Sequence, residues 1–137
     1  MVTVSMKIFF IFAAAIALVS GAQLPPEMQE MAQQLHDGCV AETGVDNGLI
    51  GPCAKGNFAD DPKLRCYFKC VFGNLGVISD DGELDAEAFG SILPEEMQGF
   101  LPTIRKCGDT KGADACELAM NFNKCLQNLD PANFMII

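Results

Sequence analysis

The segment Arg65-Cys66-Tyr67-Phe68-Lys69-Cys70 places two cysteines four residues apart. It closely follows Asp61-Pro62, a pair in which aspartate can cap a helix and proline suits the first helical turn. Cys66 and Cys70 therefore lie on one face of a predicted helix, with both thiols on the same side. We expect each thiol to bond to a different helix, which would make this helix the centre of the fold.

The other cysteines extend this pattern over most of the chain. Twenty-six residues separate Cys39 from the pair, and Cys107, Cys116 and Cys125 follow the pair. Seven cysteines in 137 residues favour a disulfide scaffold and an oxidising compartment. Six cysteines allow fifteen pairings, and spacing alone does not choose among them.

Helical periodicity continues on both sides of the cysteine pair, and no alternating pattern predicts a strand. The short second helix is weakened by two glycines and by Pro52. The predicted helices cover Pro25 to Cys39, Asp46 to Lys55, Asp61 to Leu75, Asp85 to Leu93, Pro94 to Lys106 and Asp114 to Gln127. The sequence predicts one all-α domain of about six helices.

The first 22 residues have the features of a secretory signal peptide. Lys7 precedes an apolar run from Ile8 to Val19, and the small residues Ser20, Gly21 and Ala22 follow. This run is shorter than the roughly 20 residues that span a bilayer. We expect cleavage after residue 21 or 22, a domain over residues 23–137, and a secreted, extracellular protein without membrane insertion.

Composition excludes several functions. The net charge of −9 disfavours nucleic acid and anionic membranes as partners. The single histidine, His36, excludes chemistry that needs several histidines. Neither Cys66-x3-Cys70 nor Asp80-Asp81-Gly82-Glu83 has the spacing of a zinc or EF-hand site. We expect no catalytic residue, no metal and no cofactor.

The cysteine spacing, with the segment 65–70, closely resembles that of the insect pheromone- and general odorant-binding proteins. Leu35-His36-Asp37 before Cys39, and the ending from Asp130-Pro131 to Ile137, are also similar to dipteran and related members of this family. The resemblance covers the whole chain after the signal peptide and rests on six spacings at once.

The resemblance implies the disulfides Cys39–Cys70, Cys66–Cys116 and Cys107–Cys125 around an internal hydrophobic cavity. Such bonds would close loops of about 32, 51 and 19 residues, and each would contribute about 3–4 kcal/mol of stability. That stability can offset the contacts that a hollow core loses. The function implied is a secreted carrier of odorants or pheromones, with an olfactory receptor as a candidate partner.

Phenylalanine and methionine dominate the apolar positions that could line this cavity, and methionine adapts to ligands of varied shape. Apolar stripes at helical spacing are by themselves more often core, and only the resemblance favours a cavity at some of these positions. The predicted ligand-binding residues are Leu35, Phe68, Phe89, Leu93, Met97, Leu101, Ile104, Met120, Leu126, Phe134, Met135 and Ile136.

The C-terminal tail, residues 129–137, begins with a helix stop at Pro131 and ends in four apolar residues. Because burial of such side chains is favourable, we expect the tail to fold back over the pocket. Its end at Ile137 would then need hydrogen-bond donors. His36 and Tyr67 adjoin cysteines that the implied disulfides draw together, so we predict a pH switch formed by His36, Tyr67 and Ile137. Acid would weaken these bonds and release ligand.

Three alternatives remain open. Cys53, outside the six-cysteine pattern, is predicted to be unpaired; it is either a buried thiol or the link of a disulfide-bonded dimer, so the protein is a monomer or a homodimer. The carrier could also serve in a fluid unrelated to smell. Finally, His36-Asp37-Gly38-Cys39 matches the His-Asp-x-Cys sequence of secreted phospholipases A2, but Ala32 and Gln33 occupy the places of that family's paired cysteines.

Overall fold

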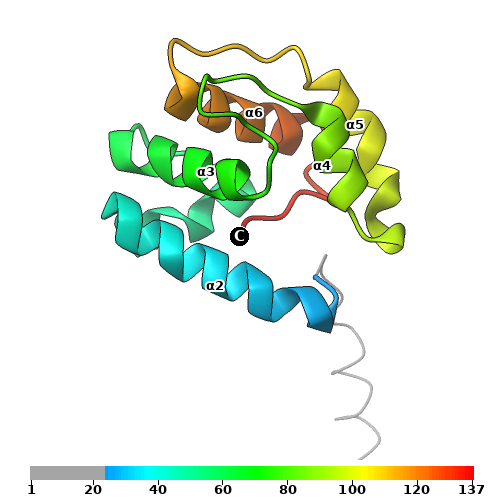
Figure 1. The fold of residues 1–137 in the computed structure, drawn as a ribbon, viewed down its shortest axis with the longest axis horizontal. Coiled ribbons are helices and arrows are strands. Elements are labelled where there is room, and N and C mark those ends of the chain that lie inside the picture. The colour runs from blue at the N-terminus through cyan, green and yellow to red at the C-terminus, as the bar shows by residue number, and fades with distance from the viewer. Residues whose placement is uncertain (1–23) are drawn as a thin grey trace, which may run out of the picture.

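The computed structural model describes residues 24–137, and the predicted signal peptide lies outside them. The described residues form five α-helices and three 3₁₀ helices (Figure 1). In chain order these are α2 (Pro26–Thr43), η1 (Asn47–Leu49), η2 (Gly51–Lys55), α3 (Pro62–Asn74), α4 (Ala86–Ile92), η3 (Glu95–Phe100), α5 (Leu101–Lys106) and α6 (Ala115–Leu129). The predicted all-α fold is confirmed; an isolated antiparallel bridge joins Ile78 and Leu84 across a turn.

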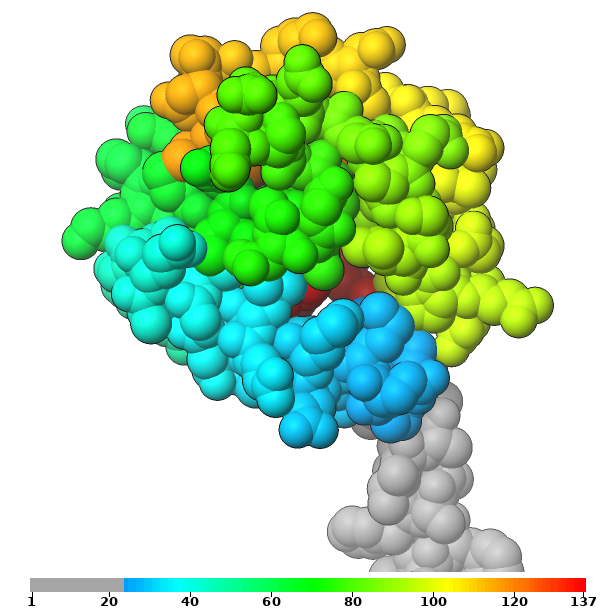
Figure 2. Space-filling model, viewed as in Figure 1, coloured from blue at the N-terminus to red at the C-terminus, as the bar shows by residue number. Residues whose placement is uncertain are grey.

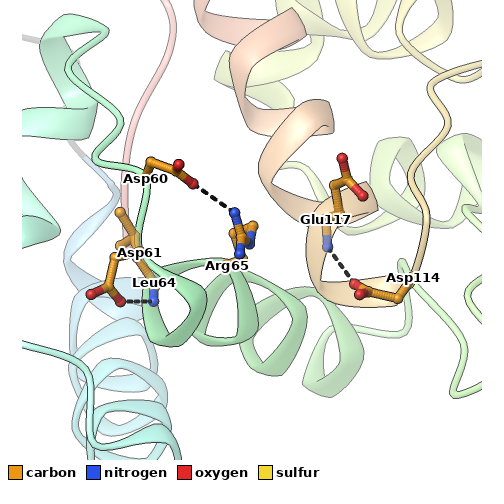
Figure 3. Close-up of polar contacts among 6 residues, drawn as sticks. All are labelled: Asp60, Asp61, Leu64, Arg65, Asp114 and Glu117. Atoms are coloured by element: carbon orange, nitrogen blue, oxygen red, sulfur yellow. Dashed lines mark hydrogen bonds and ion pairs between the residues drawn. The ribbon is translucent and has the colours of Figure 1, made fainter.

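Side-chain caps fix where the two central helices begin. The Asp61 carboxylate accepts a hydrogen bond from the backbone N–H of Leu64 at 2.9 Å, and Asp114 accepts one from Glu117 at 2.8 Å (Figure 3). These contacts satisfy N–H groups that the first turn of a helix leaves unpaired. The aspartates therefore explain why α3 and α6 begin where the sequence predicts.

Two predicted helices are divided into shorter pieces. The helix expected over residues 46–55 is two 3₁₀ helices, η1 and η2, that meet at Ile50. The helix expected over residues 94–106 is η3 followed by α5. Pro52 and Pro102 explain both breaks, because proline has no N–H for an i→i−4 hydrogen bond.

Helix α3 occupies the centre of the molecule and packs against both α2 and α6 (Figure 1). Three disulfides hold this arrangement: Cys39–Cys70 joins α2 to α3, Cys66–Cys116 joins α3 to α6, and Cys107–Cys125 joins the end of α5 to α6. This is the pairing that the family resemblance implies. Both cysteines of the segment that decides the fold are thus bonded to different helices.

The hydrophobic core lies between α3 and α6. Leu64 and Tyr67 of α3 and Phe122 of α6 are fully buried. Phe72, Phe89 and Phe122 form a cluster of edge-to-face rings, with centroids 5.3–6.0 Å apart, in the geometry that aromatic pairs prefer. None of the helices within residues 24–137 is both long and apolar enough to cross a membrane.

Candidate binding site

A pocket of about 600 Å³ lies between α2, η2 and the tail, and we call it the tail pocket. Figure 2 shows C-terminal residues in a hollow between α2 and the α4–η3 segment, although no described residue of α4 or η3 lines the tail pocket itself. The lining residues are Leu24, Gln29, Ala32, Gln33, His36, Gly51, Ala54, Phe134, Met135, Ile136 and Ile137. The pocket is thus mostly apolar with a few polar groups, as small-molecule sites generally are.

The tail reaches this pocket through a turn at the end of α6. Pro131 cannot continue the helix, and the backbone N–H groups of Asn133 and Phe134 both donate to the carbonyl of Asp130, at 3.3 and 3.1 Å. The Phe134 side chain is buried and lies near Phe58, with ring centroids 6.4 Å apart. The chain end then lies between α2 and α3 (Figure 1).

A hydrogen-bond network holds the end of the tail. The Tyr67 hydroxyl donates to the main-chain oxygen of Ile137 and lies 2.9 Å from Nδ1 of His36. Nε2 of His36 lies 2.8 Å from Oδ1 of Asn47. Because the single hydroxyl proton is committed to Ile137, Nδ1 of His36 is the donor toward the Tyr67 oxygen. The network therefore joins α2, η1, α3 and the tail.

The network accommodates both charge states of His36. An imidazolium donates from both ring nitrogens, to Tyr67 and to Asn47. A neutral His36 keeps its contact to Tyr67 and accepts from the Asn47 amide once that amide is rotated. Protonation of His36 alone therefore does not break the contact between Tyr67 and Ile137.

The tyrosine remains a hydrogen-bond donor at neutral pH. Burial raises the pKa of Tyr67 well above its ordinary value, and the nearby Asp37 and Cys53 act in the same direction. A neutral phenol donates its proton, whereas a phenolate only accepts. The Tyr67 hydroxyl is therefore suited to hold an anionic or carbonyl oxygen over the whole physiological pH range.

The predicted ligand-binding residues fall into two groups. Phe134, Met135 and Ile136 line the tail pocket, together with His36 and Ile137 of the predicted switch. The other nine lie elsewhere in the bundle: Phe68, Ile104, Met120 and Leu126 are buried in the core, Leu35, Phe89 and Leu93 pack against it, and Met97 and Leu101 are half-buried in η3 and α5. For these nine, contact with a ligand stays a prediction.

Sequence reasoning missed part of the site. Asn47, Gly51 and Ala54 belong to the network or the pocket wall, but glycine and alanine carry no chemical signal. Asn47 reaches His36 because α2 ends at Thr43 and is followed by Gly44, whose positive φ of 67° starts the turn that brings η1 back. Only the turn itself could have been predicted, from the glycine.

Cys53 is the one free cysteine within residues 24–137, and it is fully buried. Its thiol lies 3.3 Å from the carbonyl oxygen of Leu49. Burial raises the pKa of Cys53 to about 11, although a backbone hydrogen bond opposes the rise. A buried, protonated thiol is unreactive and cannot reach a second chain. This geometry favours the buried thiol over the disulfide-linked dimer.

Cys39, Glu42 and Cys70 bring potential metal-ligand atoms within 4.8 Å of one another. The two cysteines are bonded to each other, however, so neither offers the thiolate that a metal requires. This cluster is a disulfide beside a surface carboxylate.

The disulfide-linked bundle and its mostly apolar pocket define the chain as a small binding protein for hydrophobic ligands. It matches the PBP/GOBP family over residues 21–128 and belongs to that family. The resemblance inferred from the cysteine spacing is thereby confirmed.

Its relatives are insect proteins. The chain is 34% identical over 122 residues to the B1 protein of Tenebrio molitor, covering 87% of this chain and 92% of the relative. It is 28% identical over 107 residues to general odorant-binding protein 69a of Drosophila melanogaster, covering 77% and 72%. The Drosophila relative is named as an odorant-binding protein, and neither relative is named as an enzyme.

Solved structures agree with this placement. Odorant-binding protein 4 of Chrysopa pallens superposes with a TM-score of 0.75 at 30% identity, over 84% of this chain and 100% of the other. Odorant-binding protein 7 of Anopheles gambiae, solved with four disulfide bridges and an azo compound, gives 0.70 at 26% identity, over 78% and 89%. The helical fold described above is therefore that of the family.

Proposed function

We propose that this protein is a secreted carrier that holds small hydrophobic odorants or pheromones in the tail pocket and delivers them through aqueous fluid to receptors. The observation that carries the proposal is the tail pocket itself, whose wall is formed by Phe134, Met135 and Ile136. Family membership supports it. A carrier in a fluid unrelated to smell would use the same pocket. The pocket therefore indicates the class of ligand and does not indicate the tissue in which the protein acts.

Displacement of a fluorophore tests the carrier function. The chain has no tryptophan, so an uncharged, environment-sensitive apolar fluorophore must report binding. We expect saturable binding at neutral pH, in the micromolar range, and displacement by long-chain alcohols or esters. Absence of saturable binding, in folded protein with its three disulfides intact, would contradict the proposal.

Acid release is the second part of the proposal. In a chain that ends at Ile137, the oxygen held by Tyr67 belongs to a carboxylate, and hydrogen bonds to ionised groups are about twice as strong as neutral ones. The ionisable groups around it are His36 and Asp37 of α2, Cys53 of η2 and Tyr67 itself. Since His36 tolerates either charge state, protonation of the carboxylate, whose ordinary pKa is about 3.3–3.7, is the step that would loosen the tail.

We expect the affinity for the neutral fluorophore to fall about fivefold between pH 7.4 and pH 2.8, where most of the carboxylate is protonated and the charge-assisted bond is lost. The Tyr67→Phe variant keeps the ring but removes the donor. It should bind more weakly at pH 7.4 and lose most of the dependence on pH. Fluorescence titrations of both proteins at both pH values measure this. An equal acid-induced loss in Tyr67→Phe would contradict the proposed switch.

A further inference from the structure

Among the described residues that line the tail pocket there is no lysine or arginine, and His36 is the one with an ionisable side chain. Helix α2 supplies four of the lining residues; its sequence contains four acidic residues and neither lysine nor arginine. None of these four carboxylates lines the pocket, and neither does Asp130 of the tail or the exposed Lys55 of η2. In a chain that ends at Ile137, repulsion from that carboxylate opposes an anionic ligand. The described lining offers neither lysine nor arginine to compensate, and both ring nitrogens of His36 are already engaged, by Tyr67 and Asn47.

The polar groups of the lining offer hydrogen-bond acceptors. The amide nitrogen of Gln29 donates to the carbonyl of Leu24, and that of Gln33 donates to the Asp37 carboxylate, both at 2.9 Å. Since these partners can only accept, the nitrogen of each amide is identified by chemistry. Each amide oxygen is left without a donor from the described residues and can accept a hydrogen bond from a ligand.

We infer that the tail pocket selects uncharged apolar molecules with a hydroxyl group over fatty carboxylates of the same chain length. A hydroxyl can donate to the free amide oxygens, whereas an ionised carboxylate only accepts. The carboxylate would also place a second negative charge beside α2 and the end of the tail. This inference rests on the proposed carrier function and names the class of ligand for the same pocket.

Competition between matched ligands tests this selectivity. In this experiment, decan-1-ol, methyl decanoate or decanoate is added at pH 7.5 to the full folded chain with the neutral fluorophore bound, and the displacement of the fluorophore by each is measured. We expect decan-1-ol to bind at least about tenfold more tightly than decanoate, with the ester between them, because charge burial without a partner is costly. The difference in affinity between decan-1-ol and decanoate should decrease at 1 M salt, because salt screens exposed charges.

A matched pair of variants assigns the selectivity to the pocket. Gln29→Lys adds a cation to the lining, and Gln34→Lys adds the same charge to α2 at a residue that does not line the pocket. Glutamine and lysine have similar helix propensities, so both substitutions should leave helix α2 intact. Gln29→Lys should reduce the preference for decan-1-ol about fivefold, as expected for one partly exposed ion pair, whereas Gln34→Lys should leave the preference unchanged.

The outcomes separate this inference from the carrier function. Tight binding of decanoate, equal to that of decan-1-ol, would overturn the selectivity and leave the carrier function standing. Equal effects of the two lysine variants would overturn the assignment to the tail pocket. If none of the three ligands displaced the fluorophore, the carrier function and the selectivity would both be overturned.

Discussion

Joint replacement of Cys66 and Cys116 by alanine should lower the free energy of unfolding by about 4 kcal/mol, the entropy expected for opening a loop of about 50 residues. This disulfide joins α3 to α6, the two helices that enclose the core. A domain of this size has only about 5–15 kcal/mol of stability in total. The variant should therefore be near its unfolding transition, as measured by urea titration followed by circular dichroism.

Cys53→Ala is the control for this experiment. This substitution removes a buried sulfur without opening a loop. It should lower the free energy of unfolding by only about 1 kcal/mol, as small changes in core volume do. An equal decrease in the free energy of unfolding of the two variants would contradict the assigned role of the Cys66–Cys116 bond. It would mean that side-chain packing, rather than the cross-link, provides the stability.

Deletion of residues 134–137 should weaken binding of the apolar fluorophore at least about tenfold at neutral pH. The deletion removes Phe134, Met135 and Ile136, the apolar wall of the tail pocket. Burial of one such side chain contributes about 1.5–3 kcal/mol, and 1.4 kcal/mol corresponds to a factor of ten in affinity. Titration of the shortened chain with the fluorophore measures the loss.

The control is Leu129→Ala, at the end of α6. Leu129 is 50% exposed and does not line the pocket, so this change should leave the affinity within about twofold. Circular dichroism and a thiol assay should show that both proteins are folded with three disulfides. Unchanged affinity in the shortened chain would show that the ligand binds elsewhere in the bundle.

Local chemistry is the part of this fold that sequence predicts well. Asp61 and Asp114 cap their helices through contacts within three residues, and Pro131 ends α6 by lacking an N–H. Such signals depend on neighbours along the chain, so they survive in any tertiary arrangement. The breaks at Pro52 and Pro102 follow the same rule, and more weight on these prolines would have predicted both.

The position of the pocket depends on packing that periodicity does not encode. Leu126 and Ile136 are equally apolar, yet one is buried in the core and the other lines the pocket. The His36–Tyr67–Ile137 contact was predictable because disulfides and a returning tail bring these residues together. The contact between Asn47 and His36, which completes this network, was not predictable, because the position of Asn47 depends on the path of the turn after α2.

The disulfides enclose the chain from Cys39 to Cys125, whereas most of the tail pocket lies outside that interval. Its walls come from residues 24–36, from residues 134–137 and from η2, a segment that no disulfide joins directly. Opening of the pocket therefore needs no covalent bond to break. Ligand exchange can proceed on the nanosecond-to-millisecond timescale of helix ends and tails. The disulfides that join α2, α3, α5 and α6 persist for as long as the compartment stays oxidising.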